Sequence, residues 1–359
     1  MKTFTFFLLV IIFFKNDMMA QVQPVLLADN VNRPNLMVID NNSMYVGDNY
    51  NQKIIKININ NPTSAPVDLI EGLMGGPYGL TLKDEYLYIS ELEGGRILRV
   101  NLTNPNPVPE TIISNLEGPS GLNFIGNNLY IALLSGNKIC KIDISQPNPV
   151  LEDVIAVESP FDIEKVDKYI YYTQRIASGT VSRFEINNPL ATNETIISDI
   201  SFPSGLILKN NDLYFCRSKG LTVGSDDSGV VKFDINNPVT SEVILPGSID
   251  GPTGLFFLNN DLFISDFYEN KIYKAEVFIL GTKEIQNGKI QFYPNPAKDF
   301  IRINGLGTQK NYKIFDLTGK LIQTGNISRS ENTIYVNGMT KGLYFLLLED
   351  GNKFKFMID

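Results

Sequence analysis

The sequence predicts an all-β protein, a six-bladed β-propeller followed by a small Ig-like β-sandwich. A proline recurs six times at intervals of 41 to 49 residues, and each copy opens a cassette of short apolar segments separated by turn signals, four of them in every cassette but the last. Four strands in each repeat of this length are typical of one propeller blade. The last 70 or so residues lack the repeat but contain seven short apolar segments, which favours a small sandwich. The six prolines are Pro34, Pro77, Pro119, Pro160, Pro203 and Pro252.

Each cassette can be assigned strand by strand. A turn with glycine and an apolar strand follow the proline, as at Gly121 in the third cassette. A polar pair then precedes an aromatic strand, residues 129–131 in the same cassette, and a third strand is expected at 138–144. An Asn-Pro loop and a fourth strand complete the unit. The position after the aromatic strand is always small, which predicts a packing position: Gly47, Ser90, Ala132, Thr173, Cys216 and Ser265.

The two ends of the repeat array complement each other. The sixth cassette stops at Val277 without a fourth strand, whereas an unassigned apolar segment, residues 22–27, lies directly before the first cassette. We expect this segment to complete the last blade, because closing the ring removes two strand edges that would otherwise aggregate.

The cassette resembles NHL-type six-bladed propellers, most clearly in residues 262–266 and 270–274, and the resemblance covers about residues 22–278. The YWTD and gluconolactonase-like propellers share its general spacing. The resemblance implies the fold, but propellers of this kind host unrelated functions, so it implies no particular activity.

The N-terminus predicts export. Lys2 is followed by an apolar run at residues 4–14 and then by polar residues before Ala20, which is typical of a secretory signal peptide over residues 1–20. The run is too short to cross a bilayer, so we expect no transmembrane anchor. We assign the propeller to residues 21–280, a linker to 281–289 and a separate domain to 290–359. The first 283 residues contain 21 basic and 32 acidic residues, whereas the remainder carries a net charge of +3, which supports a boundary there.

The C-terminal segment contains a set of short motifs. Beyond its seven predicted strands, it resembles the type A C-terminal sorting domain of the type IX secretion system of Bacteroidetes over nearly all of residues 290–358. The resemblance implies that this domain engages the type IX secretion machinery and is removed after delivery, leaving a protein that is released or attached at the cell surface. The motif residues are Tyr293, Pro294, Asn295, Pro296, Asp299, Gly319, Gly342 and Tyr344.

Composition excludes several chemistries. The chain has no His, which removes the usual general base at neutral pH and the usual zinc ligand. Its two Cys cannot form a disulfide framework or a structural zinc site. The acidic propeller argues against nucleic acid as a partner, because that demands a basic footprint.

A ligand is expected at one end of the central channel. The first strand of each blade lines this channel, so the residue after each repeat proline should lie at its mouth. This position holds one amide, three hydroxyls and two aromatic rings, which can orient a polar ligand by hydrogen bonds and stacking. The six residues are Asn35, Tyr78, Ser120, Phe161, Ser204 and Thr253.

Two carboxylates offer an alternative. Asp162 and Glu164 are two residues apart on the predicted first strand of blade four, so they share one side of that strand and could act as metal ligands or as acid and base. They could equally be solvated or interblade polar residues, because one residue of register error turns both away. Asp226 and Asp227 could likewise form a weak calcium loop or a solvated turn.

These observations predict an exported binding module rather than an enzyme. Its ligand could be a glycan, a peptide or another surface protein, and no cofactor is expected. The alternative is a calcium-dependent lactonase or gluconolactonase-like hydrolase, and a second alternative is a structural surface protein that presents only an interface.

Overall fold

The computed structural model describes residues 24–29, 31–62, 65–218, 228–246, 249–277, 291–316, 319–350 and 353–359. The predicted signal peptide (1–20), the predicted linker (281–289), and Asp226 and Asp227 lie outside these ranges. The described residues belong to two compact units, residues 24–277 and residues 291–359, and each is treated by itself.

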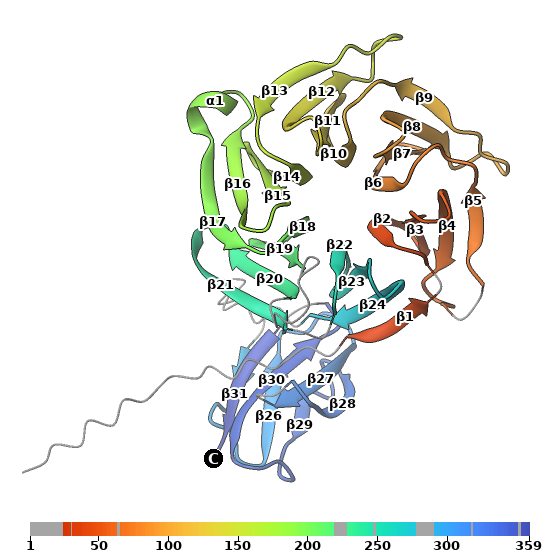
Figure 1. Cartoon of the computed structure of the whole chain (residues 1–359). Helices are drawn as coiled ribbons and strands as arrows, with labels where there is room; N and C mark the ends of the chain where they lie inside the picture. Colours follow the sequence, from red (N-terminus) through yellow and green to blue (C-terminus); the bar gives the residue numbers. More distant parts are fainter. Residues whose placement is uncertain are drawn as a thin grey trace, which may run out of the picture. The chain divides into compact units, whose positions relative to one another are not determined.

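The first unit is a β-propeller. Its described residues form six four-stranded antiparallel sheets, which follow one another around a ring (Figure 1). Blade 1 comprises β2 (Pro34–Asp40), β3 (Ser43–Asp48), β4 (Lys53–Asn58) and β5 (Val67–Ile70); blade 2, β6 (Pro77–Lys83), β7 (Tyr86–Glu91), β8 (Arg96–Asn101) and β9 (Glu110–Ile113); blade 3, β10 (Pro119–Ile125), β11 (Asn128–Leu133), β12 (Lys138–Asp143) and β13 (Glu152–Ala156); blade 4, β14 (Pro160–Val166), β15 (Tyr169–Gln174), β16 (Gly179–Glu185) and β17 (Glu194–Ile200); blade 5, β18 (Pro203–Lys209), β19 (Asp212–Arg217), β20 (Gly229–Asp234) and β21 (Asn237–Pro246); blade 6, β22 (Pro252–Leu258), β23 (Asp261–Asp266), β24 (Lys271–Glu276) and β1 (Val25–Asp29).

Blade 6 combines the two ends of the repeat array. Strand β1 pairs antiparallel with β24, with Val25 opposite Lys274 and Asp29 opposite Lys271. The sheet therefore has the order β1-β24-β23-β22, and the innermost strand β22 lies beside both β18 and β2. The N-terminal strand thus supplies the outer edge of the last blade.

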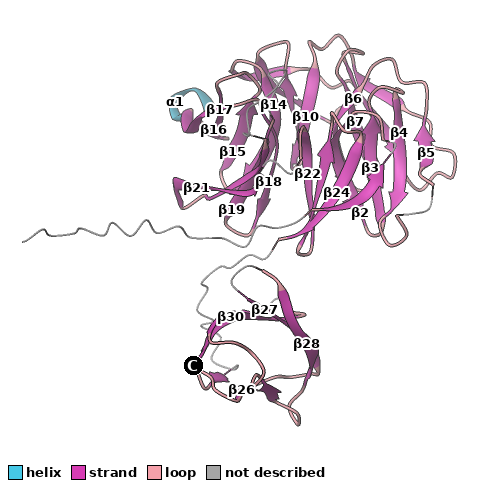
Figure 2. Ribbon diagram, turned by 60° about the horizontal axis from the view of Figure 1, so that its bottom comes forward, coloured by secondary structure: helices cyan, strands magenta, loops and turns pink. Residues whose placement is uncertain are grey.

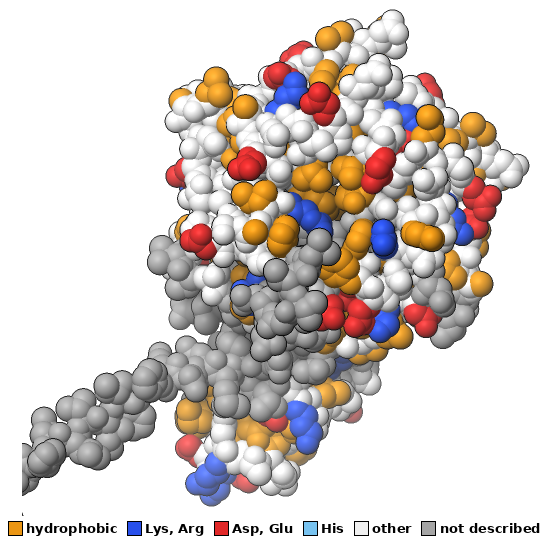
Figure 3. Space-filling view, viewed as in Figure 1, with side chains coloured by type: hydrophobic (Ala, Val, Ile, Leu, Met, Phe, Trp, Pro, Cys, Tyr) orange, Lys and Arg blue, Asp and Glu red, His pale blue; other side chains and the backbone are white. Residues whose placement is uncertain are grey.

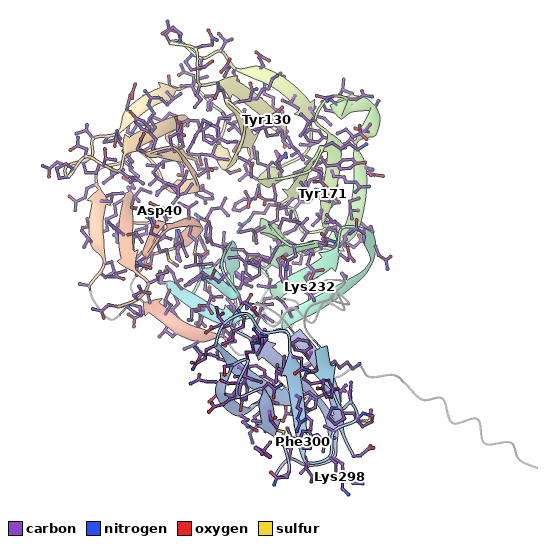
Figure 4. The ribbon with its side chains drawn as sticks, turned by 180° about the vertical axis from the view of Figure 1, so that it is seen from behind. Asp40, Tyr130, Tyr171, Lys232, Lys298 and Phe300 are labelled. Carbon is purple, nitrogen blue, oxygen red and sulfur yellow. The ribbon has the colours of Figure 1, made fainter. Side chains whose placement is uncertain are left out.

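Apolar side chains fill the space between neighbouring sheets. The second-strand residues Tyr130 and Tyr171, labelled in Figure 4, each pack in a cluster with residues of the following blade. Tyr130 shares its cluster with Ile163 of blade 4, and Tyr171 shares its cluster with Leu206 of blade 5. The core is thus divided into layers between blades, as expected for sheets that pack face to face.

Every innermost strand carries a bulge directly after its repeat proline. In blade 2 the pairing with β7 shifts between Pro77 and Leu80. Gly79 lies in this bulge, and a Cβ there would come within 1.9 Å of the Ser120 carbonyl of blade 3. The glycine therefore permits the close approach of two first strands.

The second unit consists of two sheets over one apolar core, and each of the seven strands predicted there is present. A three-stranded sheet has the order β25-β26-β29 and a four-stranded sheet the order β28-β27-β30-β31. Figure 2 shows that strands dominate throughout, with one short helix, α1 (Pro189–Thr192), among the described residues. No described helix is long and apolar enough to cross a membrane. The strands are β25 (Gln291–Tyr293), β26 (Phe300–Asn304), β27 (Lys310–Asp316), β28 (Leu321–Ile327), β29 (Thr333–Tyr335), β30 (Gly342–Leu348) and β31 (Lys353–Ile358).

Candidate functional site

Three of the six predicted mouth residues are serine or threonine, and the hydroxyls of all three are used within the protein. Ser120 donates to the Phe161 carbonyl at 2.7 Å, and Ser204 donates to the Pro252 carbonyl at 3.1 Å. Thr253 donates to the Gly251 carbonyl in its own loop. All three are buried, because the bulge after the proline turns their side chains toward protein rather than toward the channel.

Second-strand hydroxyls make an equivalent bond in the other blades. Ser90, Thr173 and Ser265 each accept an N–H from the first strand of their own blade and donate to a carbonyl at the mouth position of the next blade. The donor distances, to Ser120, Ser204 and Asn35, are 2.6, 2.9 and 2.8 Å. We call a side-chain hydroxyl hydrogen bond that joins two neighbouring blades at their first strands a hydroxyl staple, and we call the junction between two neighbouring blades a seam.

The staples alternate around the ring. Blades 2, 4 and 6 use the second-strand hydroxyl, whereas blades 3 and 5 use the mouth residue Ser120 or Ser204. Within the described residues, the seam between blades 1 and 2 has none, because blade 1 carries Gly47 in one position and Asn35 in the other. A Cβ on Gly47 would come within 2.5 Å of the Pro77 carbonyl, so a serine cannot be accommodated there without a shift.

Asn35 is the exception in a second respect. Its side chain is fully buried, yet neither its Oδ1 nor its Nδ2 has a hydrogen-bond partner. The amide lies beside the Tyr78 hydroxyl, close enough to lower the pKa of that hydroxyl, but the geometry falls short of a hydrogen bond. Burial has the larger effect and raises the pKa of Tyr78.

Tyr78 and Phe161 meet across the mouth. Their rings make an edge-to-face contact with centroids 6.2 Å apart, although they belong to blades 2 and 4. The Arg175 guanidinium lies over the Phe161 ring at 4.5 Å. Phe161 is completely buried, which corrects the expectation that its ring offers an accessible surface: Arg175 covers it. Only Tyr78 and Arg175 of this group are partly exposed.

Further aromatic and basic side chains come from neighbouring loops. Arg33, exposed before β2, lies 5.7 Å from both the Tyr50 and the Phe267 ring centroids. Phe267 makes an edge-to-face contact with Tyr268. Burial raises the pKa of Tyr78, whereas the charges of Arg175 and Arg33 both lower it. On the face seen in Figure 3, hydrophobic side chains gather around the centre of the ring, with Lys and Arg side chains among them.

Asp162 and Glu164 face the neighbouring blade. Asp162 accepts the N–H groups of Ile163 and Leu206, each at 2.9 Å. Glu164 accepts the Leu208 N–H at 3.3 Å and the Asn123 amide at 3.0 Å. The interblade role considered from the sequence is therefore the one observed, since both carboxyls satisfy donors on the inner strand β18.

Both carboxyl groups titrate far above their usual range. Burial raises the pKa of Asp162 to about 7, against the lowering effect of its two backbone N–H bonds. Burial and the nearby Asp162 charge raise the pKa of Glu164 to about 8. Two such groups can store protons near neutral pH.

The described residues show neither a cluster of metal ligands nor a reactive thiol. Among the described residues no group of three or more His, Cys, Asp or Glu side chains is placed to hold a metal ion. Cys140 and Cys216 are buried, and burial raises the pKa of both thiols, that of Cys140 to about 12. Such thiols are poor nucleophiles.

Sequence reasoning missed Arg175. It occupies the first position of the turn between the second and third strands, where the other blades carry Asn49, Leu92, Leu134, Ser218 and Phe267. Arg175 is the only cation at this position in the six blades, and this was the signal in the sequence that could have identified it. Its proximity to Tyr78 depends on the closure of the ring.

In the second unit the motif residues fix turns and strand ends. Asn295 donates to the Lys355 carbonyl and accepts the Met357 N–H, which ties the segment after β25 to β31. Pro294 and Pro296 flank it, and both of their preceding peptide bonds are cis. Tyr344 donates to the Thr340 carbonyl and stacks on Phe356. The remaining motif residues lie in or beside strands or turns: Tyr293 accepts from Asn304, the Asp299 carbonyl accepts the Val336 N–H, Gly319 has φ 77° and Gly342 begins β30.

Comparison with known proteins agrees with this division. Residues 291–358 match the family model described as a secretion system C-terminal sorting domain. No curated protein matches the chain.

Several solved structures share the fold. The nidogen/laminin complex is 14% identical with a TM-score of 0.52, covering 79% of this chain and 93% of that chain. A putative oxidoreductase (glucose dehydrogenase) from Thermus thermophilus is 12% identical with a TM-score of 0.55, covering 71% and 99%. The PQQ-bound aldose sugar dehydrogenase from Streptomyces coelicolor is 14% identical with a TM-score of 0.54, covering 72% and 98%. At these identities the likeness concerns the fold alone. The chain therefore combines a β-propeller with a C-terminal sorting domain of the type IX secretion system.

Proposed function

We propose that the protein is an exported binding module, a propeller that binds a glycan, peptide or surface protein at its channel mouth and that the sorting domain delivers to the cell surface or the medium. One observation carries the binding role. Asn35 and Arg175 hold buried polar atoms that the fold leaves without a hydrogen-bond partner, near the partly exposed Tyr78. The neighbouring Arg33 lies over the ring faces of Tyr50 and Phe267. Aromatic faces with a few convergent polar groups are typical of ligand sites.

The delivery part follows from the sorting domain. We infer that residues 290–359 engage the type IX secretion machinery, after the signal peptide has directed the chain across the inner membrane. A variant without residues 290–359 should keep a folded propeller but remain in the periplasm of a host with this machinery. Fractionation with an antibody against the propeller, with the full-length chain as control, tests this. Surface delivery of the truncated chain would contradict the assignment.

The binding part is tested with ligand arrays. A ligand found on a glycan or peptide array should bind in the presence of a chelator, and Tyr78→Ala should weaken it about tenfold or more, since Tyr78 is the accessible ring of the mouth. Tyr86→Ala, on the second strand of the same blade, is the matched control. Equal binding by wild type and Tyr78→Ala for every ligand would reject the mouth as the site.

The calcium-dependent lactonase is the competing proposal, because the buried Asp162 and the partly buried Glu164 lie two residues apart and both have raised pKa values. The binding role is favoured because three of their four carboxyl oxygens accept backbone N–H groups and the fourth accepts the Asn123 amide, which leaves no convergent carboxylate ligand set. Purified protein should therefore show no calcium-dependent lactone hydrolysis above background. Turnover that Asp162→Asn or Glu164→Gln abolishes would establish the enzyme instead.

A further inference from the structure

Polar side chains at the channel mouth are left unmatched within the protein. Both polar atoms of Asn35 and the Nη1 atom of Arg175 are buried without a hydrogen-bond partner. Native proteins satisfy nearly all such groups, so those left over call for an external partner. We define Asn35, Tyr78 and Arg175 as the mouth cluster.

The mouth cluster is one site rather than three separate features. Asn35 lies beside the Tyr78 hydroxyl, the Tyr78 ring contacts Phe161, and the Arg175 guanidinium lies 4.5 Å from the centroid of the Phe161 ring. The Arg175 charge also lowers the pKa of Tyr78 directly. The three side chains come from blades 1, 2 and 4 and converge at the mouth of the channel, where the Tyr78 ring contacts Phe161.

The charge at this site favours an anion. Among the described residues neither Arg175 nor Arg33 forms an ion pair with a carboxylate, whereas the outer Arg183, Arg99 and Arg96 all do. One opposing charge, that of Glu93, raises the pKa of Tyr78, but Glu93 is exposed and accepts the Gly76 N–H. A guanidinium without a partner presents a planar fork of N–H donors that matches a carboxylate.

The surroundings narrow the ligand to a sugar acid. Tyr50 is 69% exposed and Tyr268 is 43% exposed. Arg33 lies over the rings of both Tyr50 and Phe267, and Phe267 contacts Tyr268 edge to face. Flat aromatic faces beside a guanidinium suit a pyranose ring with a carboxylate. An extended peptide that binds by strand pairing needs a free sheet edge. The innermost strands at the mouth lie beside those of the neighbouring blades instead, which suits a compact terminal sugar better.

Resting on the proposed function that the mouth binds a ligand, we propose that this ligand is an acidic saccharide whose uronate carboxylate is held by Arg175, with the Asn35 amide and the Tyr78 hydroxyl as further hydrogen-bond partners. Arg175 is the residue that specifies the acid. Asn35 supplies a donor and an acceptor, which suits a sugar hydroxyl next to the carboxylate.

Calorimetry on the mature protein tests the proposal with trigalacturonate and, as the neutral probe, the matching galactose trisaccharide. Trigalacturonate should bind at least about tenfold more tightly than the neutral sugar, and Arg175→Gln should remove that difference. Arg175→Lys, which keeps the charge but not the fork, should restore only part of it. The matched control is Arg183→Gln, which removes an arginine that also lies over a tyrosine ring, at 4.3 Å from Tyr169, but is paired with Glu194. Thermal unfolding of each variant verifies that it is folded.

The outcomes separate this proposal from the one on which it rests. Equal affinity for the acidic and neutral sugars, unchanged in Arg175→Gln, would overturn the uronate assignment while leaving a binding site at the mouth. An acidic peptide that binds more tightly than trigalacturonate and depends on Arg175 would overturn the saccharide assignment. Failure of every array ligand to depend on Tyr78 would instead reject the proposed function.

Discussion

The seam between blades 1 and 2 differs from the other five seams of the propeller. Elsewhere a serine or threonine hydroxyl joins the first strands of neighbouring blades, whereas here Gly47 and the unpartnered Asn35 take its place. The stapled seams use their polar groups for stability. In the unstapled seam both polar atoms of the buried Asn35 side chain lack a hydrogen-bond partner, which lowers the stability of the fold. The difference separates residues that hold the ring together from those to which we assign ligand binding.

All six seams depend on a closed ring, so the largest expected effect comes from opening it. Deleting residues 21–30 removes β1, whose residues pair with β24 and whose Ala28 packs in the cluster between blades 6 and 1. The propeller should then lose roughly 10 °C or more in its unfolding midpoint, because an edge is exposed and part of a core layer is lost. Calorimetry measures this, with a chain lacking only residues 1–20 as control. An unchanged midpoint would show that β1 contributes little to the ring.

The seam between blades 4 and 5 is joined by carboxyls as well as by a hydroxyl, and this gives it a pH dependence. The folded-state pKa values of Asp162 (about 7) and Glu164 (about 8) lie above those of the unfolded chain, near 4. Between these values the folded state binds more protons than the unfolded state, so stability is retained below about pH 4 and falls as the pH rises from about 4 to 8.

The expected loss is on the order of a few kcal/mol. The double variant Asp162→Asn, Glu164→Gln should flatten this slope in denaturant titrations at several pH values. Glu110→Gln removes an exposed carboxylate, 59% accessible, and serves as the control. A slope that persists in the double variant would place the proton uptake elsewhere.

Removing one staple should cost less. Ser120→Ala deletes the hydrogen bond to the Phe161 carbonyl and leaves that buried acceptor without its side-chain donor. The free energy of unfolding should fall by about 1–3 kcal/mol. Urea denaturation of this variant, beside an exposed-site control such as Ser145→Ala, measures the loss. No loss would mean that the staples do not stabilise the seams.

The smallest effect should come from the reciprocal change in the unstapled seam. Asn35→Ser places in blade 1 the residue that blades 3 and 5 carry, and it removes a buried amide without partners. Its stability should stay within about 1 kcal/mol of wild type or rise slightly, whereas ligand binding at the mouth should weaken. A loss of stability as large as that of Ser120→Ala would remove the distinction between the two kinds of seam.

Much of the architecture could be predicted from local patterns. The repeat prolines, the polar turn pairs and the small position after each aromatic strand mark the strands of each blade because turn chemistry and alternating burial act over a few residues. The cassette without a fourth strand and the unassigned N-terminal segment likewise predicted a strand that the structure places as β1 beside β24. The motifs around Asn295 and Tyr344 predicted the sorting domain in the same way.

The mouth was harder to predict, for a physical reason. A bulge after each proline shifts the register, and one residue of shift moves a side chain to the other face of its strand. Ser120 and Ser204 therefore point into the seams rather than toward a ligand.

By itself the sequence determined which residues are strands, how many blades they form, and that a separate domain follows. Only the tertiary structure decided that Asp162 and Glu164 bind the backbone of β18 and that Arg175 meets Phe161 and Tyr78. Strand formation depends on neighbours along the chain. The environment of a residue at the mouth depends instead on blades that the closure of the ring brings together, so no local pattern of residues encodes it.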